Sequence, residues 1–161
     1  MSLPLLEISD SALTPLSETR SFAGKYESLA KIGDFVRSIA RQAGLQDSAV
    51  YAVEMAVDEA CSNVIEHAYG GEGNGEIRCT CRSNADGLTI VLEDDGRSFD
   101  PSSIKAPNLS ASLEERESHG LGLFFIRQYM DRVDFEFGTG RGNRLTMFKS
   151  RRQKARKERK H

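Results

Sequence analysis

The sequence predicts an α/β fold: a two-layer sandwich in which a mixed, mostly antiparallel sheet is covered on one face by three helices. The patterns follow the order strand, two helices, two strands, long loop, helix and two strands. Short turns join neighbouring strand patterns, which favours antiparallel pairing. Each helical pattern has a single apolar face, which indicates one helical layer on the sheet.

Five segments are predicted as strands from their apolar and β-branched content: residues 17–22, 75–82, 87–93, 133–139 and 144–150. The run Asn84-Ala85-Asp86-Gly87 has turn chemistry, so the second and third strands should form a hairpin. A glycine-rich turn joins the last two strands in the same way.

Three segments have helical periodicity. Apolar residues between 29 and 43 recur at three- and four-residue spacing, with Ser28 as the predicted N-cap and Gly44 as the C-terminal stop. A second helix is predicted over residues 47–69 and a third from Gly120.

Composition indicates one folded domain. The chain has 161 residues, of which 39% are hydrophobic and 29% are charged. No apolar run approaches the roughly 18 residues that span a bilayer, and the N-terminus lacks a signal-peptide pattern. Cys61, Cys79 and Cys81 form an odd set without C-x-x-C spacing, so we expect free thiols in a reducing cytoplasm.

We expect residues 1–14 to form an N-terminal arm, residues 15–150 the domain, and residues 151–161 a basic, disordered tail. Residues 149–161 contain eight Lys or Arg and one acid, a local balance of +7 that leaves −9 for the other 148 residues. A solubilising extension is the favoured interpretation, and a contact to an acidic partner or to nucleic acid is the alternative. The tail has no aromatic residue for base stacking, so a nucleic-acid partner is not expected.

Three polar clusters are candidates for a site. In the first, Glu59, Asn63 and His67 are four residues apart and share one face of the second helix. Asparagine is a mediocre former of helix interiors, so this stripe could face a ligand. A solvated polar face explains the stripe equally well, and the helix alone does not decide between them.

The other two clusters lie at element ends. Glu93-Asp94-Asp95-Gly96 follows an apolar strand, and Ser118-His119-Gly120-Leu121-Gly122 precedes a helix. Glycines at a helix start let backbone N–H groups approach phosphate oxygens. Taken singly, an acidic turn and a glycine cap would account for both.

In this order and spacing, the three clusters resemble the ATP-binding domain shared by histidine kinases, gyrase-type topoisomerases, Hsp90 chaperones and MutL. Within that superfamily they are most similar to the bacterial anti-sigma factor serine kinases of the RsbW type. The matching boxes are residues 57–69, 93–101 and 120–123, and the resemblance extends over about residues 17–150. It implies the histidine-kinase-like ATPase fold and ATP as cofactor.

The resemblance implies roles for the first helix stripe. Asn63 would coordinate Mg²⁺ through its side-chain oxygen, and Glu59 would be the general base that accepts the proton of an attacking hydroxyl. His67 would face the phosphates, or it would pack in the core or cap the helix.

The resemblance also implies nucleotide contacts at the other boxes. Asp94 would accept a hydrogen bond from the adenine amino group, and Gly96 would leave room for the base. Residues 97–119 would form a lid over the phosphates. The remaining expected nucleotide-binding residues are Ser98, His119, Gly120, Leu121 and Gly122.

Two positions depart from the wider pattern. Ser98 replaces the second glycine of D-x-G-x-G, as is common in the anti-sigma kinases. The family often has Gly-Thr in the last strand pair, with the threonine near adenine, whereas this chain has Gly142-Asn143. The resemblance therefore does not carry that contact over to this chain.

The implied function is an ATP-dependent anti-sigma factor serine/threonine protein kinase. It would phosphorylate a STAS-type anti-anti-sigma protein, sequester a sigma factor, and work as a cytoplasmic homodimer without a membrane partner. The alternative is a non-catalytic ATP-dependent protein-binding switch. A histidine kinase is not expected, because none of His67, His119 and His161 lies on an upstream dimerisation helix.

Overall fold

Five strands form one sheet in the computed structural model, which describes residues 14–99, 121–137 and 142–152. The strands are β1 (Ser17–Ala23), β2 (Glu76–Ser83), β3 (Gly87–Asp94), β4 (Arg132–Glu136) and β5 (Asn143–Ser150), in the spatial order β1-β2-β3-β5-β4. All five predicted strands are confirmed. Every pairing among the described strands is antiparallel, including β5 with β3 and β4 with β5. The sheet of the described strands is therefore antiparallel, and not mixed as the sequence had predicted it to be.

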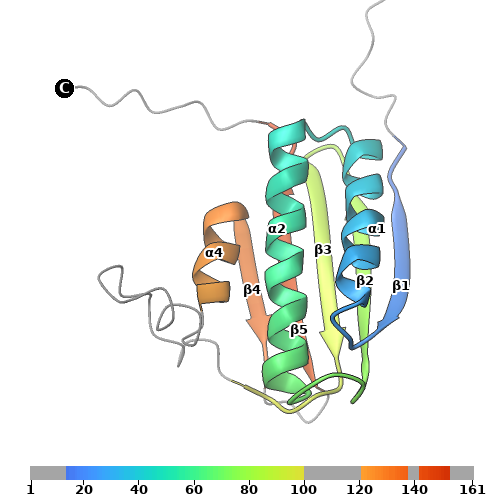
Figure 1. Cartoon of the computed structure of the whole chain (residues 1–161). Coiled ribbons are helices and arrows are strands. Elements are labelled where there is room, and N and C mark those ends of the chain that lie inside the picture. Colours follow the sequence, from blue (N-terminus) through green and yellow to red (C-terminus); the bar gives the residue numbers. More distant parts are fainter. Residues whose placement is uncertain (1–13, 100–120, 138–141, 153–161) are drawn as a thin grey trace, which may run out of the picture.

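Three helices cover one face of this sheet (Figure 1). They are α1 (Ser28–Gln42), α2 (Asp47–Asn63) and α4 (Leu121–Tyr129), and a π-helical turn, η2 (Val64–Ala68), continues α2. The helix α2 contacts α1 on one side and α4 on the other. The predicted sandwich with a single helical layer is confirmed. No described helix is long and apolar enough to cross a membrane.

The start of α1 differs from the prediction. Ser28 is the first helical residue and is buried, while Glu27 occupies the N-cap position without a side-chain capping bond. The backbone N–H groups of Ser28 and Leu29 donate to the carbonyls of Lys25 and Tyr26 at 2.9 and 3.1 Å, so the preceding turn satisfies the first free N–H groups of the helix. Gly44 ends the helix as predicted, with a φ of 80° that favours glycine.

The core lies between the helices and the sheet. Alternate residues of the central strands point toward the helices, as the period of two requires. The buried strand residues on this side include Ile77, Cys79, Cys81, Leu88, Ile90, Leu92, Leu145 and Met147. The three cysteines are free and buried, which confirms the predicted thiols.

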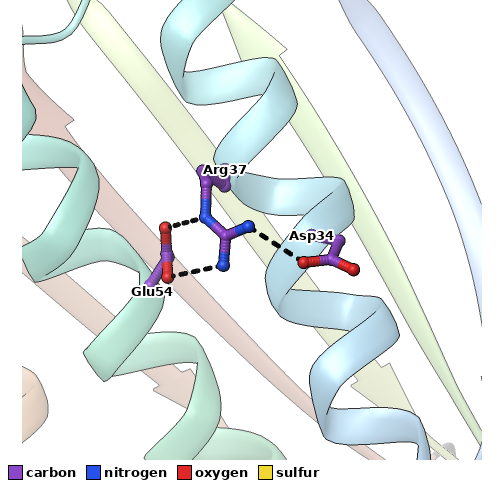
Figure 2. Close-up of polar contacts among 3 residues, drawn as sticks. All are labelled: Asp34, Arg37 and Glu54. Carbon is purple, nitrogen blue, oxygen red and sulfur yellow. Dashed lines mark hydrogen bonds and ion pairs between the residues drawn. The ribbon is translucent and has the colours of Figure 1, made fainter.

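An ion-pair network joins α1 to α2 on the outer side of the helical layer (Figure 2). Arg37 donates to both carboxylate oxygens of Glu54 and, at 2.9 Å, to Asp34. Such forked pairing fixes the relative geometry of two elements better than a single contact. Because Glu54 lies on α2, this network helps to hold the helix that carries Glu59 and Asn63.

Candidate active site

The acidic turn after β3 is held by one oxygen of a buried carboxylate. Asp94 lies directly opposite Asn143, the first residue of β5. Its Oδ1 accepts hydrogen bonds from the backbone N–H of Gly96 at 2.9 Å and from Nδ2 of Asn143 at 3.0 Å. Asp94 is 5% exposed and Asn143 is 4% exposed. Oδ2 of Asp94 makes no hydrogen bond to a described residue.

The same burial changes the acidity of Asp94. Removal from water raises the pKa of its carboxyl above the ordinary value, and the charge of Asp95 adds to this. The hydrogen bonds from Asn143 and Gly96 act in the opposite direction by stabilising the carboxylate. Asp94 is therefore a desolvated acceptor whose orientation is fixed by its neighbours.

Gly96 lets the turn pack against the end of the second helix. A Cβ at this position would lie 2.7 Å from the backbone of Ala68, closer than side-chain atoms approach. The backbone N–H of Arg97 donates to the carbonyl of Ala68 at 2.8 Å, and its guanidinium donates to the carbonyl of His67 at 3.3 Å. The space left by Gly96 is thus taken by the helix end in this structure.

Tyr69 connects three parts of the site. Its hydroxyl donates to the carbonyl of Glu76 at the start of β2 and accepts the backbone N–H of Asp95 at 3.1 Å. A Cβ on Gly75 would overlap its ring, so glycine is required beside it. The sequence did not single out Tyr69, although it closes the first matching box.

Glu59 and Asn63 lie one helical turn apart near the end of α2, and both are half-buried. Neither side chain makes a hydrogen bond to another described residue. Burial raises the pKa of Glu59, and the charges of Asp58 and Glu66 raise it further. The carboxylate is therefore a stronger base than an ordinary glutamate, and a cation beside it would be favourable.

The π-helical turn begins directly after Asn63. Such turns interrupt α-helices frequently at functional sites. Because a π-helical turn is wider than an α-helical turn, the angle around the helix axis between His67 and Asn63 differs from that in a regular α-helix. The His67 ring packs against Phe99, with 5.9 Å between the ring centroids. Its Nε2 lies 4.0 Å from a carboxylate oxygen of Glu66. The structure therefore gives His67 a packing contact.

A small cavity brings Asn63, Asp94 and Asn143 together. Its other lining residues are apolar: Ala60, Val64, Leu92, Phe99, Ile126, Phe135 and Leu145. The volume is about 20 Å³, which holds roughly one water molecule. A purine ring is larger than this volume. Glu59 does not line this cavity.

The remaining predicted residues are only partly described. Ser98 is exposed. Leu121 and Gly122 are the first residues of α4, which agrees with a helix start at the predicted position, and only their backbone is described. His119 and Gly120 lie outside the described residues, as do residues 1–13 and 153–161 of the predicted arm and tail.

Comparison with known families decides what kind of domain this is. The family model described as the histidine kinase-like ATPase domain matches residues 22–149. The chain belongs to this family. It is 31% identical over 133 residues to the serine-protein kinase RsbW of Bacillus cereus (strain G9842), which covers 80% of this chain and 82% of the relative. The serine-protein kinase RsbW of Listeria innocua is also 31% identical, with 83% of the relative covered.

Solved structures share the fold of this histidine kinase-like ATPase. The RsbU and RsbW domains of Rv1364c from Mycobacterium tuberculosis match with a TM-score of 0.58 and 17% identity, over 84% of this chain and 32% of that chain. The catalytic domain of the histidine kinase ThkA matches with a TM-score of 0.50 and 15% identity, over 83% of this chain and 96% of that one.

These matches confirm the predicted resemblance to RsbW-type kinases, the fold and the use of ATP. The predicted enzyme class, a protein serine/threonine kinase, is confirmed at the level of the family. Tyr69 and Asn143 were not predicted as site residues. Asn143 stands at the position where the sequence departs from the family pattern, and only strand pairing shows that it lies against Asp94.

Proposed function

We propose that this chain uses ATP to phosphorylate a serine on a STAS-type anti-anti-sigma protein, and that it binds a sigma factor in the alternative complex. Relatives named serine-protein kinase RsbW support the reaction class. The observation that carries the proposal is the placement of Asn63 and Asp94 in one cavity, with Glu59 one turn away on α2.

The chemistry assigned to Glu59 is proton transfer. The serine hydroxyl would give its proton to the Glu59 carboxylate while its oxygen forms a bond to the γ-phosphorus. The bond between the γ-phosphorus and the bridging oxygen would break, and ADP would leave with that oxygen. The raised pKa of Glu59 supports this role, because a stronger base accepts the proton more readily.

Asn63 fits a Mg²⁺ ligand by its chemistry. Its amide oxygen is a hard donor, it is half-buried, and it makes no hydrogen bond to a described residue that would have to be broken. When bound, Mg²⁺ would neutralise charge on the phosphates. No group of three or more His, Cys, Asp or Glu in the described ranges could hold a metal alone, so nucleotide phosphates and water would complete the coordination.

Asp94 would orient the base through Oδ2, while Gly96 keeps the turn close to the helix end. We assign the phosphates to the start of α4, where Leu121 and Gly122 begin the helix, together with Gly120, His119 and Ser98. The positive end of the helix dipole favours anions there. The proposal also includes assembly of the chain into a homodimer. Measurement of its molar mass in solution by light scattering would test this part.

Labelled ATP, Mg²⁺ and a STAS partner test the proposal directly. We expect label on a serine of the partner, and a sigma factor that is released from the kinase when unphosphorylated partner is added. Asn63→Ala should lose Mg²⁺-dependent ATP binding, whereas the exposed Asn74→Ala should retain it.

Two outcomes would overturn the kinase assignment. Failure of the wild type to transfer phosphate while ATP binds would leave a non-catalytic ATP-dependent switch. Full activity of Glu59→Gln would show that Glu59 is not the base.

A further inference from the structure

Asn143 leaves one buried hydrogen-bonding atom without a partner. Its Nδ2 group donates one hydrogen to Asp94 at 3.0 Å and the other to the carbonyl of Arg97 at 3.1 Å. Its Oδ1 is buried and has no partner among the described residues. More than nine-tenths of buried polar groups in folded proteins are paired, so a single orphan acceptor beside a ligand cavity requires an explanation.

The orientation of this amide is fixed by its surroundings. Exchanging its oxygen and nitrogen would place Oδ1 against Oδ1 of Asp94 and the carbonyl of Arg97, which are both acceptors at neutral pH. Two donor–acceptor bonds would become two repulsive contacts. The amide nitrogen therefore faces Asp94 and Arg97, and Oδ1 is the atom that remains unpaired.

Two acceptors on neighbouring residues therefore lack a partner among the described residues. Oδ2 of Asp94 makes no hydrogen bond to a described residue, and Oδ1 of Asn143 is unpaired. Both residues line the cavity, and they are direct neighbours across β3 and β5. A group that satisfies both atoms from one position must carry two hydrogens on one atom, as an amino group or a water molecule does.

We propose that Asn143 is a specificity-determining residue whose Oδ1 accepts the second hydrogen of the adenine amino group, while Asp94 accepts the first. This inference rests on the proposed ATP-binding function and deepens it. A 6-oxo purine would place an acceptor against both atoms, so it is rejected by unpaired and repulsive groups rather than by size. A base with a single amino hydrogen leaves one buried acceptor unsatisfied.

The test compares affinities for ATP, N6-methyl-ATP and N6,N6-dimethyl-ATP in the wild type, Asn143→Ala and Asn74→Ala, measured by calorimetry with Mg²⁺. Asn74 is exposed and outside the cavity, so Asn74→Ala is the matched control. In the wild type and control, each methyl group should weaken binding about tenfold, the usual effect of one unmet hydrogen bond. In Asn143→Ala, N6-methyl-ATP should bind within about threefold of ATP, because the second acceptor is gone.

The ratio of the affinities for ATP and N6-methyl-ATP is compared within each protein, so a general loss of affinity or stability cancels. A purely structural Asn143 would change both affinities equally and leave the ratio unchanged. The inference is overturned if wild type binds N6-methyl-ATP as tightly as ATP, a result that needs no variant to fold. It is also overturned if Asn143→Ala keeps the tenfold preference. If wild type binds no ATP, the proposed function fails and the inference fails with it, whereas ATP binding with an unchanged ratio overturns the inference alone.

Discussion

The two ends of the candidate site are built differently. At one end, Asp94 is fixed by hydrogen bonds from Gly96 and Asn143, and the turn after it is tied to Tyr69 and to the helix end. At the other end, Glu59 and Asn63 are half-buried and make no hydrogen bonds to described residues. The first end is organised before a ligand arrives, and the second keeps polar groups available for one.

In the proposed function, this difference separates recognition of the base from phosphate transfer. Groups that orient a ligand are most effective when their geometry is already fixed. Groups that exchange a proton or hold a metal must remain accessible. Their partly buried polar atoms lower the stability of the fold while they have no hydrogen-bond partner. We therefore expect changes at the Asp94 end to alter affinity and stability, and changes at the Glu59 end to alter rate.

The largest expected effect is on the rate of phosphate transfer. Glu59→Gln removes the proposed base and should lower the single-turnover rate by about 10²- to 10⁴-fold. The unfolding midpoint should stay the same or rise, because a half-buried acid is replaced by a neutral group. Glu18→Gln on the exposed strand β1 is the control and should transfer phosphate at the wild-type rate. A similar loss in both variants would remove the special role of Glu59.

At the organised end, Gly96→Ala should lower the free energy of unfolding by about 1–3 kcal/mol, because its Cβ would meet the backbone of Ala68. ATP affinity should fall with it as the Asp94 turn is displaced. Gly33→Ala is the matched control: nothing lies within 4 Å of its Cβ position in α1, so it should gain roughly 0.5–1 kcal/mol. Urea unfolding measures both, and equal stability of the two variants would contradict the contact.

A smaller loss is expected for Tyr69→Phe. The ring and its packing remain, but the bonds to Asp95 and Glu76 are lost, which should cost about 1–2 kcal/mol. Tyr51→Phe removes an exposed hydroxyl and should change stability by less than about 0.5 kcal/mol. The backbone amide hydrogen of Asp95 should exchange faster in Tyr69→Phe and at the wild-type rate in Tyr51→Phe. Unchanged protection of this amide in Tyr69→Phe would show that Tyr69 does not hold the turn.

The smallest effect concerns pH. Burial raises the pKa of Glu59 most, and the charge of Asp58 is the next cause. A base must be deprotonated, so the transfer rate should fall as pH drops through this raised pKa. Asp58→Asn removes one cause and should move the acid limb of the rate profile to lower pH. Asp47→Asn, at the start of the same helix, should leave the limb in place.

The elements of the fold could be predicted because their signals are local. Apolar periodicity defined α1, α2 and α4, and the hairpin turn at residues 84–87 placed β2 beside β3. The Ser28 cap was predicted wrongly, because a preceding turn satisfies its backbone N–H and local sequence does not reveal that bond. The π-helical turn was also missed, since a slightly widened turn leaves the apolar pattern nearly unchanged.

The site was predicted in part for the same reason. Glu59, Asn63 and Asp94 lie in recognisable boxes, and the structure brings Asn63 and Asp94 to one cavity. Asn143 is 49 residues from Asp94 in the sequence, and their contact depends on the register of β3 and β5. No local pattern specifies that register, so the orphan oxygen of Asn143 becomes visible only in three dimensions.

The most direct test measures ATP affinity and single-turnover phosphate transfer in Asp94→Asn and Glu59→Gln side by side. The account predicts a crossed result. Asp94→Asn should bind ATP about 10- to 100-fold more weakly, because a charge-assisted hydrogen bond is lost, yet transfer at near the wild-type rate when saturated. Glu59→Gln should bind ATP normally and transfer at least about 100-fold more slowly. If both variants change the same quantity, the division of the site into a recognition end and a reaction end is contradicted.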